Sequence, residues 1–151
     1  AERIKDEEKN WEQLANAWLS AREWTKAIPP LTKAAEMSED GGLFLRLGQT
    51  YMQEEDWKNA EKNIRYAIKK GDLDNPGRAW LLLGITRNKK GIKFENSALF
   101  AFKRSTGYDD MEADARRWVK VIEAKQARRE ADRLAAEAAE AELADDTIYF
   151  N

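Results

Sequence analysis

The residues of this sequence that could carry acid–base chemistry are its carboxylates, which stand side by side at Glu54–Asp56 and at Asp109–Asp110. Neighbouring carboxylates can act as general acid and general base when their surroundings separate their pKa values. Histidine and cysteine are absent, which excludes Ser-His and Cys-His nucleophile pairs and zinc sites of imidazole and thiolate. Both acidic runs fall at expected helix ends, where acidic residues suit the start of the next helix. We therefore expect no catalytic residue, no cofactor and no metal site.

The composition limits the kinds of partner that the chain can bind. Its 151 residues are enough for one domain with a core, and its net charge is −2 with 36% charged residues spread along the whole length. That balance argues against a surface built for nucleic acid or anionic lipid. No run of 18 apolar residues is present, so no membrane insertion is expected. The absence of cysteine leaves the redox compartment open.

A repeat organises the elements that position these side chains. The stretch Trp18–Leu31 is echoed by Tyr51–Ile64, at an offset of 33 residues. Eight aligned positions keep their class, whether small, aliphatic or aromatic: Trp11 and Phe44, Leu14 and Leu47, Ala15 and Gly48, Trp18 and Tyr51, Trp24 and Trp57, Ala27 and Ala60, Leu31 and Ile64, Ala34 and Ala67. A third copy begins at Trp80, Leu83 and Gly84, slips by one residue in the turn 88–93, and continues through Ala98 and Phe102.

A period near 34 residues with this order of large, small and aromatic positions is the signature of the tetratricopeptide repeat (TPR). The chain resembles that family over roughly residues 8 to 105. The resemblance implies an all-α, right-handed solenoid of about three helical hairpins, at residues 8–40, 41–74 and 76–107. The small residues let the two helices of a unit approach closely, and stacked units bury the apolar faces that a single hairpin leaves exposed.

Two departures from the repeat pattern are expected to change the structure locally. Arg87 replaces the aromatic residue of the first helix of the third unit, which should make that end more polar or more open. Pro29 and Pro30 fall in the second helix of the first unit. If Thr25 is the N-cap of that helix, the helix should start late or kink, because proline removes hydrogen bonds of the helix.

The end of the chain changes character from Asp109. Residues 109–124 place Ala115, Trp118, Val119 and Ile122 on one face, which predicts a helix that caps the last repeat. Residues 125–151 form a charged, alanine-rich helical extension and a tail, with "TIYFN" as the last five residues. We expect that tail to be disordered or bound to something. The extension either projects into solvent or serves as a dimerisation or docking helix.

The register of the first helices predicts the residues of a concave groove for a peptide or protein partner. The candidate residues are Asn16, Leu19, Leu45, Gln49, Met52, Arg78, Leu81, Ile85 and Asn88. The alternative interpretation of the apolar members is contact with the C-terminal segment, or scattered surface side chains. A clamp for a C-terminal carboxylate is disfavoured, because Glu12 and Leu45 stand where such a clamp needs basic or polar groups. The six tryptophans fall on core positions of the repeat or on the capping helix.

A narrower resemblance rests on the stretches "LANAWLSAREWTKAIPPLTKAAEMSEDGGLFLRLGQTYMQEEDWKNA" and "KKGDLDNPGRAWLLLGI". They resemble bacterial repeat proteins encoded with TonB-type energy-transduction systems. The resemblance implies a periplasmic accessory that binds TonB, ExbB or ExbD components during nutrient or iron uptake. Two functions are thus expected as alternatives: a non-catalytic interaction scaffold, or a self-assembly module that forms homo-oligomers through the C-terminal helix.

Overall fold

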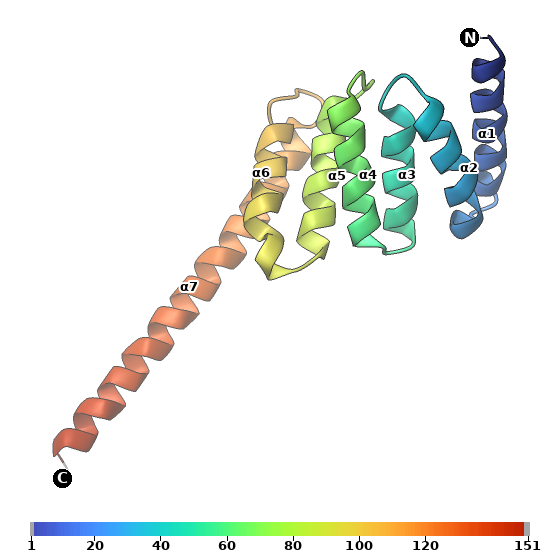
Figure 1. Cartoon of the computed structure of the whole chain (residues 1–151). Helices are drawn as coiled ribbons and strands as arrows, with labels where there is room; N and C mark the ends of the chain where they lie inside the picture. The colour runs from blue at the N-terminus through green and yellow to red at the C-terminus, as the bar shows by residue number, and fades with distance from the viewer. Residues whose placement is uncertain (1, 150–151) are drawn as a thin grey trace.

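A computed structural model describes residues 2–149, and every regular element in that range is helical (Figure 1). In chain order the elements are α1 (Glu2–Ser20), α2 (Trp24–Met37), α3 (Gly42–Gln53), α4 (Trp57–Lys70), α5 (Pro76–Lys89), the 3₁₀ turn η1 (Ile92–Phe94), α6 (Glu95–Ser105) and α7 (Glu112–Tyr149). The first six helices form three hairpins, α1–α2, α3–α4 and α5–α6, stacked side by side. The protein is an all-α solenoid of the TPR type, with α7 covering its last hairpin.

Small residues bring the two helices of each hairpin into contact. A Cβ atom on Gly84 would lie 2.5 Å from the ring of Phe102, and one on Gly48 would lie 2.6 Å from the side chain of Ile64. Both glycines therefore sit where a first helix touches a large side chain of its second helix. The small residues of the second helices, Ala27, Ala60 and Ala98, are each 0% exposed.

The burial of one repeated leucine shows how the hairpins stack. Leu47 and Leu83 are both 2% exposed, whereas Leu14, at the same repeat position, is 44% exposed. Leu47 and Leu83 have a preceding hairpin to pack against. Among the described residues nothing covers α1 in the same way, so Leu14 is exposed although its place in the repeat pattern predicts burial. The stacking contact between hairpins, more than the hairpin itself, buries this position.

Helix α2 does not start late. It begins at Trp24 and runs without a break through Pro29 and Pro30, and its N-cap is Glu23, not Thr25. The two prolines cannot donate to the carbonyls one turn earlier, which belong to Thr25 and Lys26. Both of these residues are exposed, so water can satisfy the carbonyls, and the helix tolerates the prolines.

The capping helix and the extension are one continuous helix, α7, of 38 residues. Ala115 and Ile122 are fully buried against α6, and the Trp118 ring stacks on Phe102 at a centroid distance of 5.4 Å. From residue 127 to residue 148 every side chain is exposed, and Figure 1 shows this part leaving the solenoid. The helix continues through Tyr149, so the first three residues of the tail that we expected to be disordered or bound to something are helical, while Phe150 and Asn151 lie outside the described residues. In residues 2–149 no helix is long and apolar enough to span a membrane.

Candidate functional site

The acidic runs that could have carried acid–base chemistry have structural partners. The Asp56 carboxylate caps α4, accepting hydrogen bonds from the Asn59 backbone N–H at 3.0 Å and from its side-chain amide at 2.7 Å. These hydrogen bonds lower the pKa of Asp56 below its usual value. Asp110 accepts a hydrogen bond of 2.5 Å from the Asn75 side chain. Within residues 2–149 no group of three acidic residues is arranged to hold a metal ion.

The nine predicted groove residues all lie on the first helices of the hairpins. Arg78 is exposed and the other eight are half-buried. By helix they are Asn16 and Leu19 on α1, Leu45, Gln49 and Met52 on α3, and Arg78, Leu81, Ile85 and Asn88 on α5.

Two adjoining hollows lie across these helices. One of about 470 Å³ is lined by Leu45, Gln49 and Arg78, and one of about 380 Å³ by Leu19 and Gln49. Arg46 lines both hollows, so they meet at Arg46 and Gln49. We call this continuous surface the first-helix groove. Met52 and Asn88 are on the same helices but line neither hollow.

Arg46 is the groove residue that the sequence-based selection missed. Its guanidinium crosses from α3 to α1, where it donates to Glu12 Oε1 at 3.3 Å and to Asn16 Oδ1 at 2.5 Å. It stands one position beyond Leu45, at the edge of the predicted stripe, and reaches the groove through the length of its side chain. The sequence offered one indication of this contact. Glu12 lies 34 residues before Arg46, about one repeat, so adjacent first helices bring the two side chains together. Asn16 is thus engaged by Arg46.

Leu81 and Ile85 face a different environment from Leu45. Both pack against the cluster of Ala98, Phe102 and Ile122 that joins α6 to α7. Leu81 also lines a hollow of about 500 Å³ with Trp118 of α7. For these two residues the structure shows contact with the C-terminal segment, the alternative that the sequence left open, and they line neither hollow of the first-helix groove.

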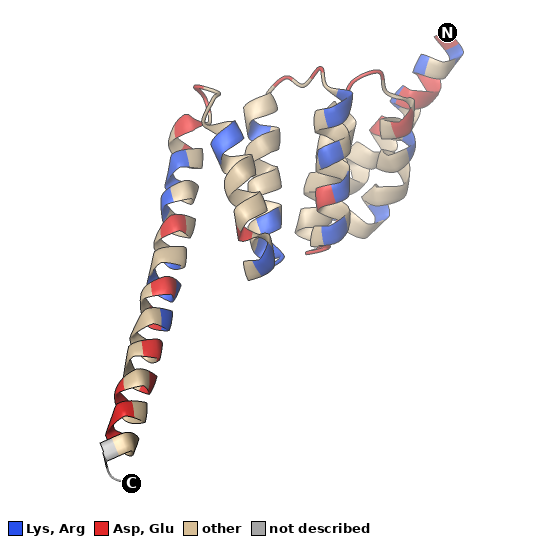
Figure 2. Cartoon of the chain, turned by 60° about the vertical axis from the view of Figure 1, so that its left-hand side comes forward, with Lys and Arg blue, Asp and Glu red and all other residues tan. Residues whose placement is uncertain are grey.

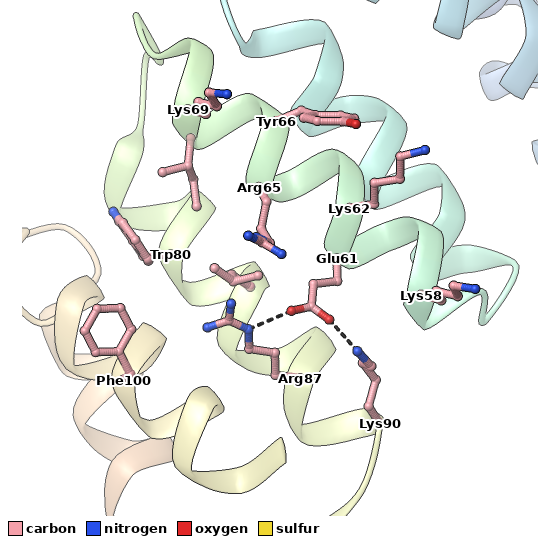
Figure 3. A pocket seen from close by; sticks show the side chains of 12 residues that line it. Lys58, Glu61, Lys62, Arg65, Tyr66, Lys69, Trp80, Arg87, Lys90 and Phe100 are labelled. Carbon is pink, nitrogen blue, oxygen red and sulfur yellow. Dashed lines mark hydrogen bonds and ion pairs between the residues drawn. The ribbon is translucent and has the colours of Figure 1, made fainter. Parts of the chain in front are cut away.

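A second and more basic groove lies on the other face, between the second helices α4 and α6 (Figure 3). Its volume is about 530 Å³. Four cations follow one side of α4, and aromatic side chains from α5 and α6 stand across from them. We call it the basic groove and define it by Lys58, Lys62, Arg65, Lys69, Trp80 and Phe100. The sequence-based selection named none of these residues as a site, although the four cations recur at helical spacing.

Glu61 lies at the end of the basic groove and binds two cations of α5 and the following turn. Its carboxylate accepts a hydrogen bond of 2.9 Å from Arg87 Nε and one of 2.5 Å from Lys90 Nζ. Arg87 also donates to the Ser97 carbonyl at 3.0 Å. The residue that replaces the repeat aromatic therefore makes this end of the third unit polar. Burial favours a raised pKa for Glu61, but the hydrogen bonds and charges of Lys90 and Arg87 outweigh it and hold the pKa below its usual value.

The lowered pKa of Glu61 predicts a pH-dependent contribution to stability. The stabilisation is fully present above the unfolded-state pKa, near 4.5, and is lost as the pH falls through the lower folded-state value. Glu61→Gln should therefore lower the free energy of unfolding by about 1–3 kcal/mol at neutral pH, because hydrogen bonds to charged groups are lost. In urea titrations, the difference in free energy of unfolding between Glu61→Gln and the unchanged protein should shrink as the pH falls below about 4.5. Glu36→Gln, at an exposed site, is the control, and a deficit that is constant with pH would contradict the assignment.

Comparison with known proteins identifies the fold of the chain. No protein-family model and no curated protein matches the chain. The N-terminal domain of stress-induced protein-1 (STI-1) from C. elegans is similar, with 20% identity, a TM-score of 0.69, and coverage of 80% of this chain and 97% of that one. The chain has the TPR fold.

Two further structures with this fold carry descriptions that name a complex or a peptide-binding site. The TPR2B domain of yeast Sti1, solved as a complex with pHsp70, is 13% identical with a TM-score of 0.66, and the match covers 79% of this chain and 98% of that one. YrrB, described as a TPR protein with an unusual peptide-binding site, is 22% identical with a TM-score of 0.64, and the match covers 77% of this chain and 58% of that one. At these identities the likeness concerns the fold.

Proposed function

We propose that this protein is a non-catalytic interaction scaffold that binds a peptide segment of a partner protein in the first-helix groove. The observation that carries the proposal is the continuous surface across α1, α3 and α5, formed by two hollows that meet at Arg46 and Gln49. The similarity to YrrB and to the yeast Sti1 domain, whose descriptions name a peptide-binding site and a pHsp70 complex, supports it.

The chemistry of the groove suits a peptide. Leu45 provides a half-buried apolar contact, while in the part of the chain that the structure describes the Gln49 amide and the Arg78 guanidinium have no hydrogen-bond partner. An amide can both donate to and accept from the backbone of an extended segment. A guanidinium can bind a carboxylate or carbonyl through two parallel hydrogen bonds. The groove thus offers apolar contact at Leu45 together with two free polar groups.

Peptide selection tests the proposal with variants that do not disturb the core. Peptides selected from a random library on the full chain should bind Arg78→Ala about tenfold or more weakly, because a hydrogen bond to a charged group contributes about 1.5–3 kcal/mol. They should bind Gln49→Ala about two- to tenfold more weakly, because a neutral hydrogen bond contributes about 0.5–1.5 kcal/mol. Lys33→Ala, an exposed change on α2, should bind as the unchanged protein does. The proposal fails if no peptide is selected, or if both groove variants retain full affinity.

We also propose that the partner belongs to a TonB/ExbB/ExbD energy-transduction system and that the protein acts in the periplasm as an accessory of nutrient or iron uptake. The support is the resemblance carried by residues 14–60 and 69–85. The same groove variants serve as baits in extracts of the bacterial envelope. Capture of TonB-system proteins by the unchanged chain, with loss in Arg78→Ala, supports this setting, and equal capture by both contradicts it.

A further inference from the structure

The exposed half of α7 ends in a strongly acidic segment. Between residues 137 and 146 it carries five carboxylates and no cation: Glu137, Glu140, Glu142, Asp145 and Asp146. Only Glu137 has an ion-pair partner within the described residues, Arg133 of the same helix. Leu143 within this segment and Ile148 just after it are 68% and 74% exposed. Figure 2 shows this acidic end far from the solenoid. The segment therefore combines free negative charge with exposed apolar side chains.

The basic groove has the complementary character. Lys58, Lys62, Arg65 and Lys69 have no carboxylate partner in the described part of the chain, while Glu61 is already bound by two other cations. Like charges one helical turn apart destabilise a helix slightly, so an anion in the groove would relieve their repulsion. Phe100 across the groove is 57% exposed. An acidic segment with apolar side chains fits both properties.

We infer that the acidic end of α7 from a second copy of this chain binds in the basic groove. The lengths match: Lys58 to Lys69 span about 16 Å of helix and Glu137 to Asp146 about 14 Å, at 1.5 Å per residue. The chain's own acidic segment does not reach this groove, because α7 is one continuous helix that leaves the solenoid from α6 (Figure 1). Leu143 and Ile148 then supply the apolar contact for Phe100.

Arg129 fixes the direction in which α7 leaves the solenoid. Its guanidinium forms two hydrogen bonds with the carboxylate of Glu95, the first residue of α6, and that carboxylate is 8% exposed. Gln126 adds a hydrogen bond of 3.0 Å to Asn96. These contacts hold the last turns of α7 that touch the solenoid, so the acidic segment beyond them is presented outward to another copy.

This contact is independent of the proposed peptide binding. None of the residues that line the basic groove lines either hollow of the first-helix groove. A negative result for self-association can therefore be distinguished from a negative result for peptide binding.

Charge reversal with rescue tests the contact in the full chain. Light scattering and sedimentation at low salt should show association above the monomer mass of 17.4 kDa. About 1 M salt, where the Debye length is about 3 Å, should abolish it. Lys62→Glu/Arg65→Glu and Glu140→Lys/Glu142→Lys should each weaken association at least tenfold. An equimolar mixture of the two variants should regain it, because the unchanged groove of one variant meets the unchanged helix of the other, and the reversed groove meets the reversed helix. Lys33→Glu/Lys93→Glu, with the same change of net charge at exposed sites outside the groove, should associate normally.

Each remaining outcome overturns the inference. A chain that stays monomeric at low salt has no such contact. Association that survives in Lys62→Glu/Arg65→Glu places the interface elsewhere, for example between two α7 helices. A mixture that fails to recover, although both variants retain the helical circular dichroism of the unchanged protein, shows that the two surfaces do not meet.

Discussion

Replacing Phe102 with alanine should lower the free energy of unfolding by about 3–5 kcal/mol, the usual loss for a fully buried phenylalanine. The side chain is 0% exposed, and its ring fills the space left by Gly84 on α5 while stacking on Trp118 of α7. One ring therefore joins three helices. The cavity created by the change lies where the last hairpin meets the capping helix, so urea unfolding followed by circular dichroism should show a lower midpoint.

The same helix offers a matched control for this change. Phe100 is two residues earlier on α6, 57% exposed, and contacts the Trp80 ring edge-on at 6.1 Å. Phe100→Ala should change the free energy of unfolding by no more than about 1 kcal/mol, because little surface is lost from the core. If the two variants lose similar stability, the packing of α7 on the last hairpin is not what the structure describes.

The fold was largely predictable because its chemistry repeats. The small residues Gly48 and Gly84 recur at a fixed position, and each faces a large side chain from the second helix of its own hairpin. Their periodicity is visible in the sequence and needs no knowledge of the neighbouring unit. Leu14 shows the limit of that reasoning. Its repeat position is buried only where another hairpin covers it, and a position in a pattern does not say whether that neighbour is present.

The candidate sites were only partly predictable. A helical period assigns Leu45 and Gln49 to one face, but it does not show that Arg46 reaches across to α1, because this depends on the length of the side chain and the spacing of the helices. It also does not show that α7 borders Leu81. The basic groove joins α4 to α6, which belong to different hairpins. The helical spacing of its cations along α4 is visible in the sequence. The aromatic side chains that face them become apparent only in the packed structure.

Two adjacent glycines should respond to alanine in opposite directions. A Cβ atom on Gly41 would lie 2.3 Å from the carbonyl oxygen of Ala67 and 3.0 Å from that of Gly71. Both obstacles are backbone atoms, and Ala67 is inside α4, so neither can move without distorting a helix or its end. The Gly41 N–H also donates to the Gly71 carbonyl at 2.9 Å. Gly41→Ala should cost about 3 kcal/mol or more, the upper range for inserting a group into filled space.

Gly42→Ala is the control and should be stabilising. Its Cβ would meet only the Asp40 Oδ1 atom, at 3.1 Å, and a small shift of that side chain relieves the contact while it keeps the 2.8 Å hydrogen bond that Oδ1 accepts from the Gly42 N–H. Gly42 is the first residue of α3 and its φ is not in the left-handed region, so alanine there should add about 0.4–1 kcal/mol by restricting the unfolded chain. Thermal and urea unfolding of both variants measure the contrast. Equal effects would show that the loop before α3 does not pack on the end of α4. Opposite effects would show that the loop entering α3 packs on the end of α4 through backbone atoms, where no side-chain pattern in the sequence could have revealed the contact.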